Sequence, residues 1–159
     1  GVVLWSCGKS GETENSDPQK TSAQASSEIA AQNIDAREKP IAPQANVDIV
    51  YYFMTTQRCS NCMKIEAYTR EAVEKGFADA LKKETMIWRM VNVEESANNH
   101  FIKDYQLYTK SVVLVKMRNG KQVEWKNLDQ IWPLLLLNDK AGFQKYVTDE
   151  VKKFMGKSS

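Results

Sequence analysis

Large apolar side chains are spread unevenly along the chain, and their distribution changes near residue 46. Residues 8–46 consist mainly of Ser, Gln, Ala, Glu, Lys and Asn, with very few large apolar side chains. Such a segment cannot bury enough surface to offset the conformational entropy that folding removes. We therefore expect residues 1–46 to precede the folded part largely as a disordered linker, and one domain to occupy residues 47–157.

Within the domain, short apolar runs alternate with longer amphipathic stretches. The apolar runs predict strands over residues 47–55, 85–93, 111–117 and 122–126. The remaining periodic stretches predict helices over residues 63–81, 94–105, 128–137 and 140–155, of which 94–105 is polar. Strands and helices alternate up to residue 117, which is typical of a sheet covered by helices.

The connections between these elements predict a topology. A strand, a helix and a second strand favour a right-handed parallel crossover. Asn119-Gly120 between the last two strands predicts a tight antiparallel hairpin. The expected fold class is therefore α/β, with a central mixed four-stranded sheet and helices on both faces.

Charge and composition exclude several classes of function. The net charge is +2, and no basic stripe with interleaved aromatic residues is present, so we expect no nucleic-acid partner. The single histidine, His100, leaves little scope for catalysis by a Ser–His pair or for a His-based metal site. No apolar run reaches the length of a membrane span. We expect no cofactor.

The candidate chemistry lies in Cys59-Ser60-Asn61-Cys62, where the first predicted strand leads into the first predicted helix. A helix N-terminus carries partial positive charge and unpaired N–H groups, which stabilise a thiolate. Arg58 adds a full positive charge, and Ser60 or Asn61 is expected to cap the helix. This combination makes a cysteine nucleophilic near neutral pH. A second thiol nearby then resolves the mixed disulfide.

Two other interpretations of the cysteine pair stay open. One is a static structural disulfide. The other is a site for a soft metal. The pair supplies two ligands whereas zinc takes four, so a metal would also need Met54, Met63, Cys7 or a second copy of the chain. Thiolate and thioether ligands favour Cu(I) or an iron–sulfur cluster bridging two chains.

The third cysteine, Cys7, follows Leu4-Trp5-Ser6, and this stretch resembles the lipobox of a bacterial lipoprotein signal. Residues 2–4 are then a remnant of the apolar part of the signal peptide. The polar residues that follow suit a tether. We therefore expect a lipid on Cys7, a location in the bacterial periplasm or cell envelope, and membrane contact through this anchor alone.

Residues 47–156 resemble the thioredoxin superfamily. The resemblance rests on a CxxC motif placed between the first strand and a long helix, and on Asn119-Gly120 in the final hairpin. It implies a thioredoxin fold. Residues 57–66 and 77–82 are also similar to small bacterial thioredoxin-like lipoproteins, some of which carry the label of a nitrophenyl compound nitroreductase subunit.

The resemblance implies roles for the two cysteines. Cys59 is the nucleophile and Cys62 the resolving thiol of a thiol–disulfide oxidoreductase. The partner is then a disulfide or dithiol of another protein, and in an oxidising envelope a membrane donor supplies electrons or the domain acts as an oxidant. The alternative is a non-catalytic binding module, or a reductase subunit, that captures a soft metal or a protein partner.

The chain departs from the family at three places. Arg58 replaces the usual Trp and Ser60-Asn61 replaces the usual Gly-Pro, in the loop that influences redox potential. The usual buried acid behind the resolving thiol falls on Phe53. Ser111 takes the position of a substrate-binding cis-Pro. Because a non-proline cis bond costs about 3–4 kcal/mol, we expect the Lys110–Ser111 bond to be trans.

Overall fold

Four strands form one mixed sheet in the computed structural model, which describes residues 41–42 and 45–156. The central strand β1 (Val47–Met54) runs parallel to β2 (Met86–Asn92) and antiparallel to β3 (Ser111–Arg118). The edge strand β4 (Lys121–Asn127) pairs antiparallel with β3, which gives the order β2-β1-β3-β4. The predicted α/β class with a mixed four-stranded sheet is confirmed.

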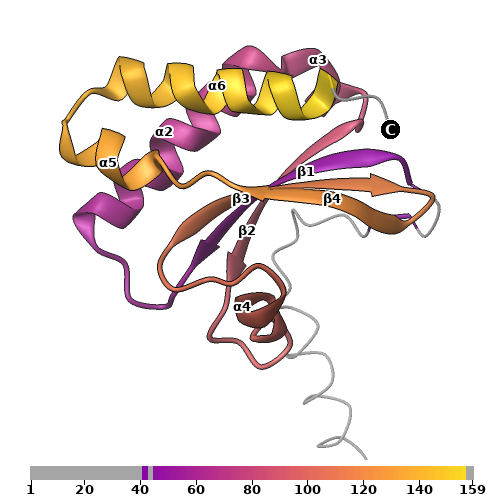
Figure 1. Cartoon of the computed structure of the whole chain (residues 1–159), viewed down its shortest axis with the longest axis horizontal. Helices are drawn as coiled ribbons and strands as arrows, with labels where there is room; N and C mark the ends of the chain where they lie inside the picture. Colours follow the sequence, from indigo (N-terminus) through magenta and orange to yellow (C-terminus); the bar gives the residue numbers. More distant parts are fainter. Residues whose placement is uncertain (1–40, 43–44, 157–159) are drawn as a thin grey trace, which may run out of the picture. The chain divides into compact units, whose positions relative to one another are not determined.

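Helices lie on both faces of this sheet (Figure 1). One face carries the helical layer of α2 (Ser60–Gly76), α3 (Ala78–Lys82), α5 (Ile131–Leu136) and α6 (Lys140–Gly156). The other face carries the short helix α4 (His100–Asp104). Among the described helices, none combines the length and the apolar character that crossing a membrane requires.

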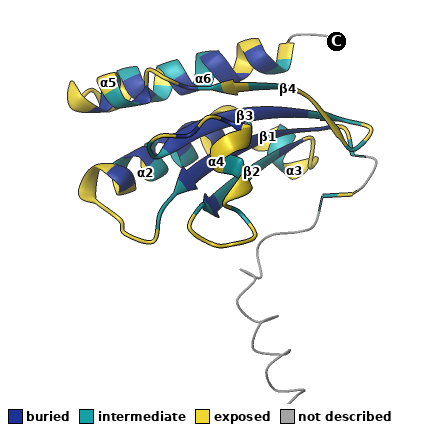
Figure 2. Cartoon of the chain, turned by 60° about the horizontal axis from the view of Figure 1, so that its bottom comes forward, coloured by how far each residue is buried: buried dark blue, intermediate teal, exposed yellow. Residues whose placement is uncertain are grey.

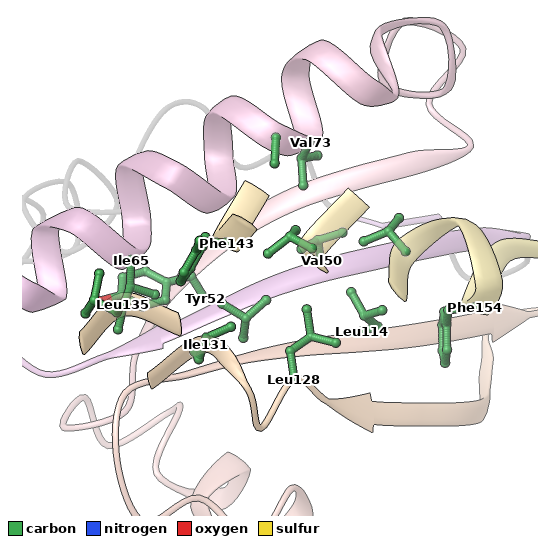
Figure 3. Packing of buried hydrophobic residues seen from close by; sticks show 14 of the residues in the cluster. Val50, Tyr52, Ile65, Val73, Leu114, Leu128, Ile131, Leu135, Phe143 and Phe154 are labelled. Atoms are coloured by element: carbon green, nitrogen blue, oxygen red, sulfur yellow. The ribbon is translucent and has the colours of Figure 1, made fainter. Parts of the chain in front are cut away.

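Alternate residues of the central strands build the two sides of the core, because successive side chains of a strand point to opposite faces. Val50 and Tyr52 of β1 and Leu114 of β3 face α2, α5 and α6 and belong to the first core cluster (Figure 3). The helices contribute most of the other apolar side chains of this cluster, namely Ile65, Ala72, Val73, Ile131, Leu135, Phe143, Val147, Val151 and Phe154.

The second core cluster lies on the face that α4 covers. Tyr51 and Phe53 of β1 pack there against Phe101 and Tyr105, whose rings stack with centroids 5.8 Å apart. Ile41 and Ala45, which precede β1, also pack against this cluster. Both faces of β1 are therefore buried, which explains why the strand is apolar at nearly every position.

Two predicted helices differ from the observed ones. The stretch 63–81 forms two helices, because the backbone leaves helical geometry at Phe77, with φ −137° and ψ 30°. Of the stretch 94–105, only α4 is helical. The side chains of Asn92 and Asn98 explain the second difference, since Asn92 accepts from the Glu94 N–H at 3.1 Å and Asn98 donates to the Asn92 carbonyl at 3.1 Å. Such local bonds stabilise turns in place of a helix.

The predicted hairpin is present between β3 and β4. Asn119 and Gly120 have φ values of 52° and 73°, the left-handed geometry that a two-residue hairpin turn of this type requires. The turn also holds the chain before β1, because Asn119 N–H donates to Asn46 Oδ1 at 2.8 Å and Gly120 N–H donates to the Ala45 carbonyl at 3.2 Å.

Candidate functional site

The loop of residues 55–59 joins β1 to α2 and is held against the chain that follows β2. Thr56 N–H donates to Glu94 Oε2 at 2.9 Å, and Asn92 Nδ2 donates to the Thr56 hydroxyl at 3.0 Å. The hydrogen bonds from Thr56, assisted by the charge of Lys110, hold the pKa of the Glu94 carboxyl below its ordinary value, so it stays an ionised acceptor. The tip of the loop and the start of α2 are otherwise exposed (Figure 2).

Cys59 itself is the N-cap of α2. Its backbone is extended, with φ −92° and ψ 162°, and its sulfur accepts from the Cys62 N–H at 3.1 Å. Its carbonyl oxygen accepts from the Met63 N–H at 3.0 Å. The expectation that Ser60 or Asn61 caps this helix was wrong, because both lie inside its first turn and are exposed. The cap places one sulfur directly at the positive end of the helix.

A disulfide joins Cys59 and Cys62, whose Cα atoms lie 5.0 Å apart. The two residues differ in exposure: Cys59 is exposed, whereas 2% of Cys62 is exposed. A thiol or thiolate arriving from solvent therefore has access to Cys59 and not to Cys62. Such an arrangement suits disulfide exchange in which the first cysteine bonds to the partner and the second closes the ring.

Arg58 forms an ion pair with Glu66, which lies farther along α2. Glu66 also accepts from Arg70 at 3.3 Å. The carboxylate of Glu66 therefore compensates part of the Arg58 charge that the sequence suggested for Cys59. The first turn of α2 contains no acidic residue, so the helix N-terminus is not opposed there. In the sequence, only helical spacing indicated that Glu66 lies near the cysteine pair, because residues 62 and 66 are one helical turn apart.

Tyr52 is a site residue that the sequence interpretation missed. Its hydroxyl donates to the Cys62 carbonyl oxygen at 2.8 Å, and its side chain is fully buried. Burial raises the pKa of the phenol to about 12, although Arg58 opposes this shift. The phenol therefore remains a neutral donor throughout the physiological pH range.

Phe53 takes the position at which the resemblance implies a buried acid. It lies on the opposite side of the sheet from Tyr52. It belongs to the second core cluster and stacks with Tyr51 at a centroid distance of 5.2 Å. The β1 side chain that reaches Cys62 belongs to the preceding residue, Tyr52. The alternation of strand side chains was the signal that distinguishes these two positions.

Ser111 begins β3 and lies opposite Phe53 in the pairing with β1. Its hydroxyl donates to the Thr109 carbonyl at 2.9 Å, and the Lys110–Ser111 bond is trans as predicted. Trp132 Nε1 donates to the Lys110 carbonyl at 2.9 Å and ties α5 to this loop. The pairing puts the Ser111 side chain on the face of Phe53, whereas Tyr52 contacts Cys62 from the other face.

The candidate soft-metal ligands lie in different surroundings. Met63 is 52% exposed on α2, and Met54 at the end of β1 packs against the first core cluster. In residues 41–42 and 45–156, no group of three or more His, Cys, Asp and Glu side chains is arranged to hold a metal ion. Cys7 and its predicted lipid lie outside the described residues.

A pocket of about 270 Å³ opens beside the loop that carries Cys59. Its lining comes from the end of β1, the end of β2, α4 and the segment before β3. The lining residues are Phe53, Met54, Thr55, Val93, Ile102, Leu107, Tyr108, Thr109 and Lys110. Two of them, Ile102 at 43% and Tyr108 at 89%, are also exposed at the surface. The surface at this end of the sheet is therefore hollowed and lined mainly by apolar side chains.

Comparisons with known proteins add little to this geometry. No family model matches the chain, and no curated protein matches it. A solved structure described as "Structure of a malarial protein" is 15% identical over 51% of this chain and 80% of that chain, with a TM-score of 0.34. A likeness at this level supports no statement about fold or function.

Proposed function

We propose that this chain is a thiol–disulfide oxidoreductase of the thioredoxin superfamily that acts through Cys59 and Cys62. One observation carries the proposal: a disulfide joins an exposed cysteine at the N-cap of α2 to a buried cysteine three positions along the chain. A bridge of such short separation closes a very small loop, and the stabilisation from loop closure grows with loop length. A structural staple therefore explains the pair poorly.

The reaction proceeds by two exchanges. The Cys59 thiolate attacks one sulfur of a substrate disulfide, so that a mixed disulfide forms and the other substrate sulfur leaves as a thiolate. Cys62 then loses its proton and attacks the Cys59 sulfur, which releases the second substrate thiolate and forms the Cys59–Cys62 disulfide. Two electrons pass to the substrate, and the reverse sequence oxidises a dithiol.

The contacts at the N-cap support this role for Cys59. The Cys62 N–H that points at its sulfur at 3.1 Å stabilises negative charge there. The exposed side chains of Met63 and Tyr108 and the adjacent pocket offer an apolar surface to a partner. The substrate is therefore a disulfide or dithiol of another protein, bound mainly by apolar contacts rather than by charge.

The proposed location is the bacterial cell envelope, with the domain anchored by a lipid on Cys7. The support is the lipobox-like stretch that ends at Cys7 and the polar residues that follow it. In an oxidising compartment a membrane donor supplies electrons, or the domain acts as an oxidant. Mass analysis of the protein expressed from its full-length gene in a bacterial host tests this proposal, since a lipid mass on Cys7 supports it and an unmodified Cys7 contradicts it.

The decisive experiment on the cysteine pair is its equilibrium with graded glutathione buffers. The full chain carrying Cys7→Ser is equilibrated, alkylated and weighed. We expect a two-electron transition between roughly −120 and −270 mV, the range of known oxidoreductases. Cys59→Ser abolishes exchange with a protein disulfide and leaves the far-UV circular dichroism unchanged.

Three outcomes contradict the proposal. A pair that stays oxidised across every buffer is a structural disulfide. A pair that is reduced yet protected from alkylation, with metal recovered in the purified protein, belongs to the soft-metal binding module. Exchange that persists in Cys59→Ser removes the role assigned to that residue.

A further inference from the structure

Tyr52 ties the buried cysteine to the sheet. Its hydroxyl bonds to the Cys62 carbonyl at 2.8 Å, across ten residues of chain. Two other hydrogen bonds lie within the turn itself, from the Met63 N–H to the Cys59 carbonyl and from the Cys62 N–H to the Cys59 sulfur. The Tyr52 phenol thus connects Cys62 to β1 through a hydrogen bond.

The ring of Tyr52 is itself held firmly. It is fully buried in the first core cluster, at the end where Ile65 and Leu135 lie (Figure 3). It stacks with Trp88 of β2, with centroids 6.5 Å apart and planes 7° apart. A ring packed in this way has few rotamers available, so its hydroxyl is a fixed donor.

We propose that Tyr52 is a positioning residue for the second exchange, in which Cys62 resolves the mixed disulfide. The inference rests on the proposed function. When the Cys59–Cys62 bond is open, no covalent link holds the two sulfurs together. The bond from Tyr52 then keeps the first turn of α2 in place, so that the Cys62 sulfur stays within reach of the Cys59 sulfur.

The step that Tyr52 assists needs no reactant other than the mixed disulfide, the Cys62 thiol and solvent. The Cys62 thiol gives its proton to solvent, and its thiolate forms a bond to the Cys59 sulfur. The bond between Cys59 and the substrate sulfur breaks, and the substrate leaves as a thiolate that takes up a proton. The tyrosine donates a hydrogen bond to the Cys62 carbonyl throughout, and its own proton is not transferred.

Removing the Tyr52 hydroxyl slows the second exchange and leaves the rate of the first exchange unchanged. In Tyr52→Phe, Cys59 keeps its exposure and its position at the N-cap, so the first exchange proceeds at the wild-type rate. Resolution slows roughly threefold to tenfold, the effect of losing one buried hydrogen bond. The mixed disulfide at Cys59 therefore accumulates.

Tyr51→Phe is the matched control. It removes the same hydroxyl from the neighbouring residue of β1, which is also buried but belongs to the second core cluster on the other face. Reduced full chains carrying Cys7→Ser are mixed with glutathione disulfide, quenched in acid at intervals and weighed. We expect the ratio of mixed to intramolecular disulfide to rise in Tyr52→Phe and to stay at the wild-type value in Tyr51→Phe. Equal ratios in all three proteins overturn the inference.

A second measurement uses the wild-type protein, so it does not depend on whether a variant folds. In the reduced wild-type protein, the Tyr52 hydroxyl proton and the Cys62 carbonyl carbon report their hydrogen bond by nuclear magnetic resonance. Coupling between them, with slow exchange of the hydroxyl proton, supports the inference. A phenol that is free in the reduced state overturns it.

The variant Cys62→Ser distinguishes a wrong role for Tyr52 from a wrong proposed function. Cys62→Ser performs only the first exchange, alone or combined with Tyr52→Phe. If neither protein forms a mixed disulfide with glutathione, the proposed function fails and the inference fails with it. If both form it at the same rate and resolution in Tyr52→Phe is as fast as in wild type, the role of Tyr52 alone is wrong.

Discussion

At the scale of single residues, Cys59 and Cys62 differ in their access to solvent and in the groups that contact them. Cys59 is exposed at the end of a helix, with an N–H directed at its sulfur. Cys62 is buried and its carbonyl is bonded to Tyr52. An exposed, stabilised thiolate suits attack on a large substrate, and a buried thiol beside it suits the closure that follows.

Glu66 provides a test of the electrostatics around Cys59. Glu66→Gln removes the carboxylate that pairs with Arg58, which leaves more positive charge near the sulfur and raises the thiolate fraction. We expect the alkylation rate of reduced Cys59 at pH 7 to rise roughly twofold to fivefold, since exposed ion pairs are worth at most about 1 kcal/mol. Glu74→Gln, an exposed change two turns further along α2, should leave the rate unchanged. A rate in Glu66→Gln no higher than in that control contradicts the argument.

At this scale the sequence predicted the site residues that are close together in the chain. It did not predict those that meet only in the folded protein. The CxxC spacing and Arg58 are visible in the sequence because they are consecutive. Tyr52 takes its role from a contact that forms only when α2 packs on β1, and Glu66 takes its role from an ion pair with the loop before α2. An error of one position along a strand moves a side chain to the other face, which is why Phe53 was considered in place of Tyr52.

At the scale of elements, the site depends on how α2 is fixed to its neighbours. Tyr52 holds its first turn, and the Glu71 carboxylate in its middle bonds to Lys140 at 2.7 Å and to Gln144 at 2.8 Å on α6. A Cβ added at Gly76, its last residue, would lie 3.4 Å from Thr148 of α6. The helix is thus held to β1 at Cys62 and to α6 in its middle and at its last residue.

Strands were predicted more accurately than helices for a physical reason. The four strands were located within about two residues, because their apolar runs are set by burial on the sheet. Helix ends depend on local hydrogen bonds and on backbone geometry at single residues. Phe77 and the side chains of Asn92 and Asn98 interrupt stretches whose composition alone is compatible with a helix.

The contact between α2 and α6 predicts a dependence of stability on pH. Hydrogen bonds from Lys140, Lys75 and Gln144 lower the pKa of Glu71 from 4.5 to about 2. A carboxyl with a lowered folded-state pKa stabilises the fold above its unfolded pKa, and this stability is lost as pH falls through the folded value. The urea midpoint of Glu71→Gln should therefore be lower than wild type at pH 7, and the gap should close between about pH 4.5 and pH 2.

Lys140→Met supplies the reference for this prediction. In that background the largest single partner of Glu71 is absent, so adding Glu71→Gln should change the urea midpoint less than it does in wild type. A gap between wild type and Glu71→Gln that is the same at pH 7 and at pH 3 would show that the carboxylate charge does not matter.

At the scale of the whole domain, the sheet order brings the loop before Cys59 and the pocket to the same end of the sheet. β1 and β2 are parallel and end together, and β3 begins opposite the end of β1 because those two strands are antiparallel. The loop before Cys59, the end of β2, α4 and the segment before β3 therefore surround the same pocket. The sequence predicted the strands that meet there, but the pocket arises from side chains of four separate segments.

This arrangement predicts that the pocket distinguishes protein substrates from small ones. Ile102→Asp places a charge at its exposed apolar wall, which a protein partner must cover but glutathione need not touch. We expect the reduced domain to react with the disulfides of insulin roughly fivefold more slowly than wild type, the cost of one useful contact residue. Its reaction with glutathione disulfide should be unchanged. Val123→Asp, on the edge strand β4, removes an equally exposed apolar side chain outside the pocket and should alter neither rate. A parallel loss in both reactions would mean that Ile102→Asp disturbs the cysteines themselves, and no loss in either would mean that partners bind elsewhere on the domain.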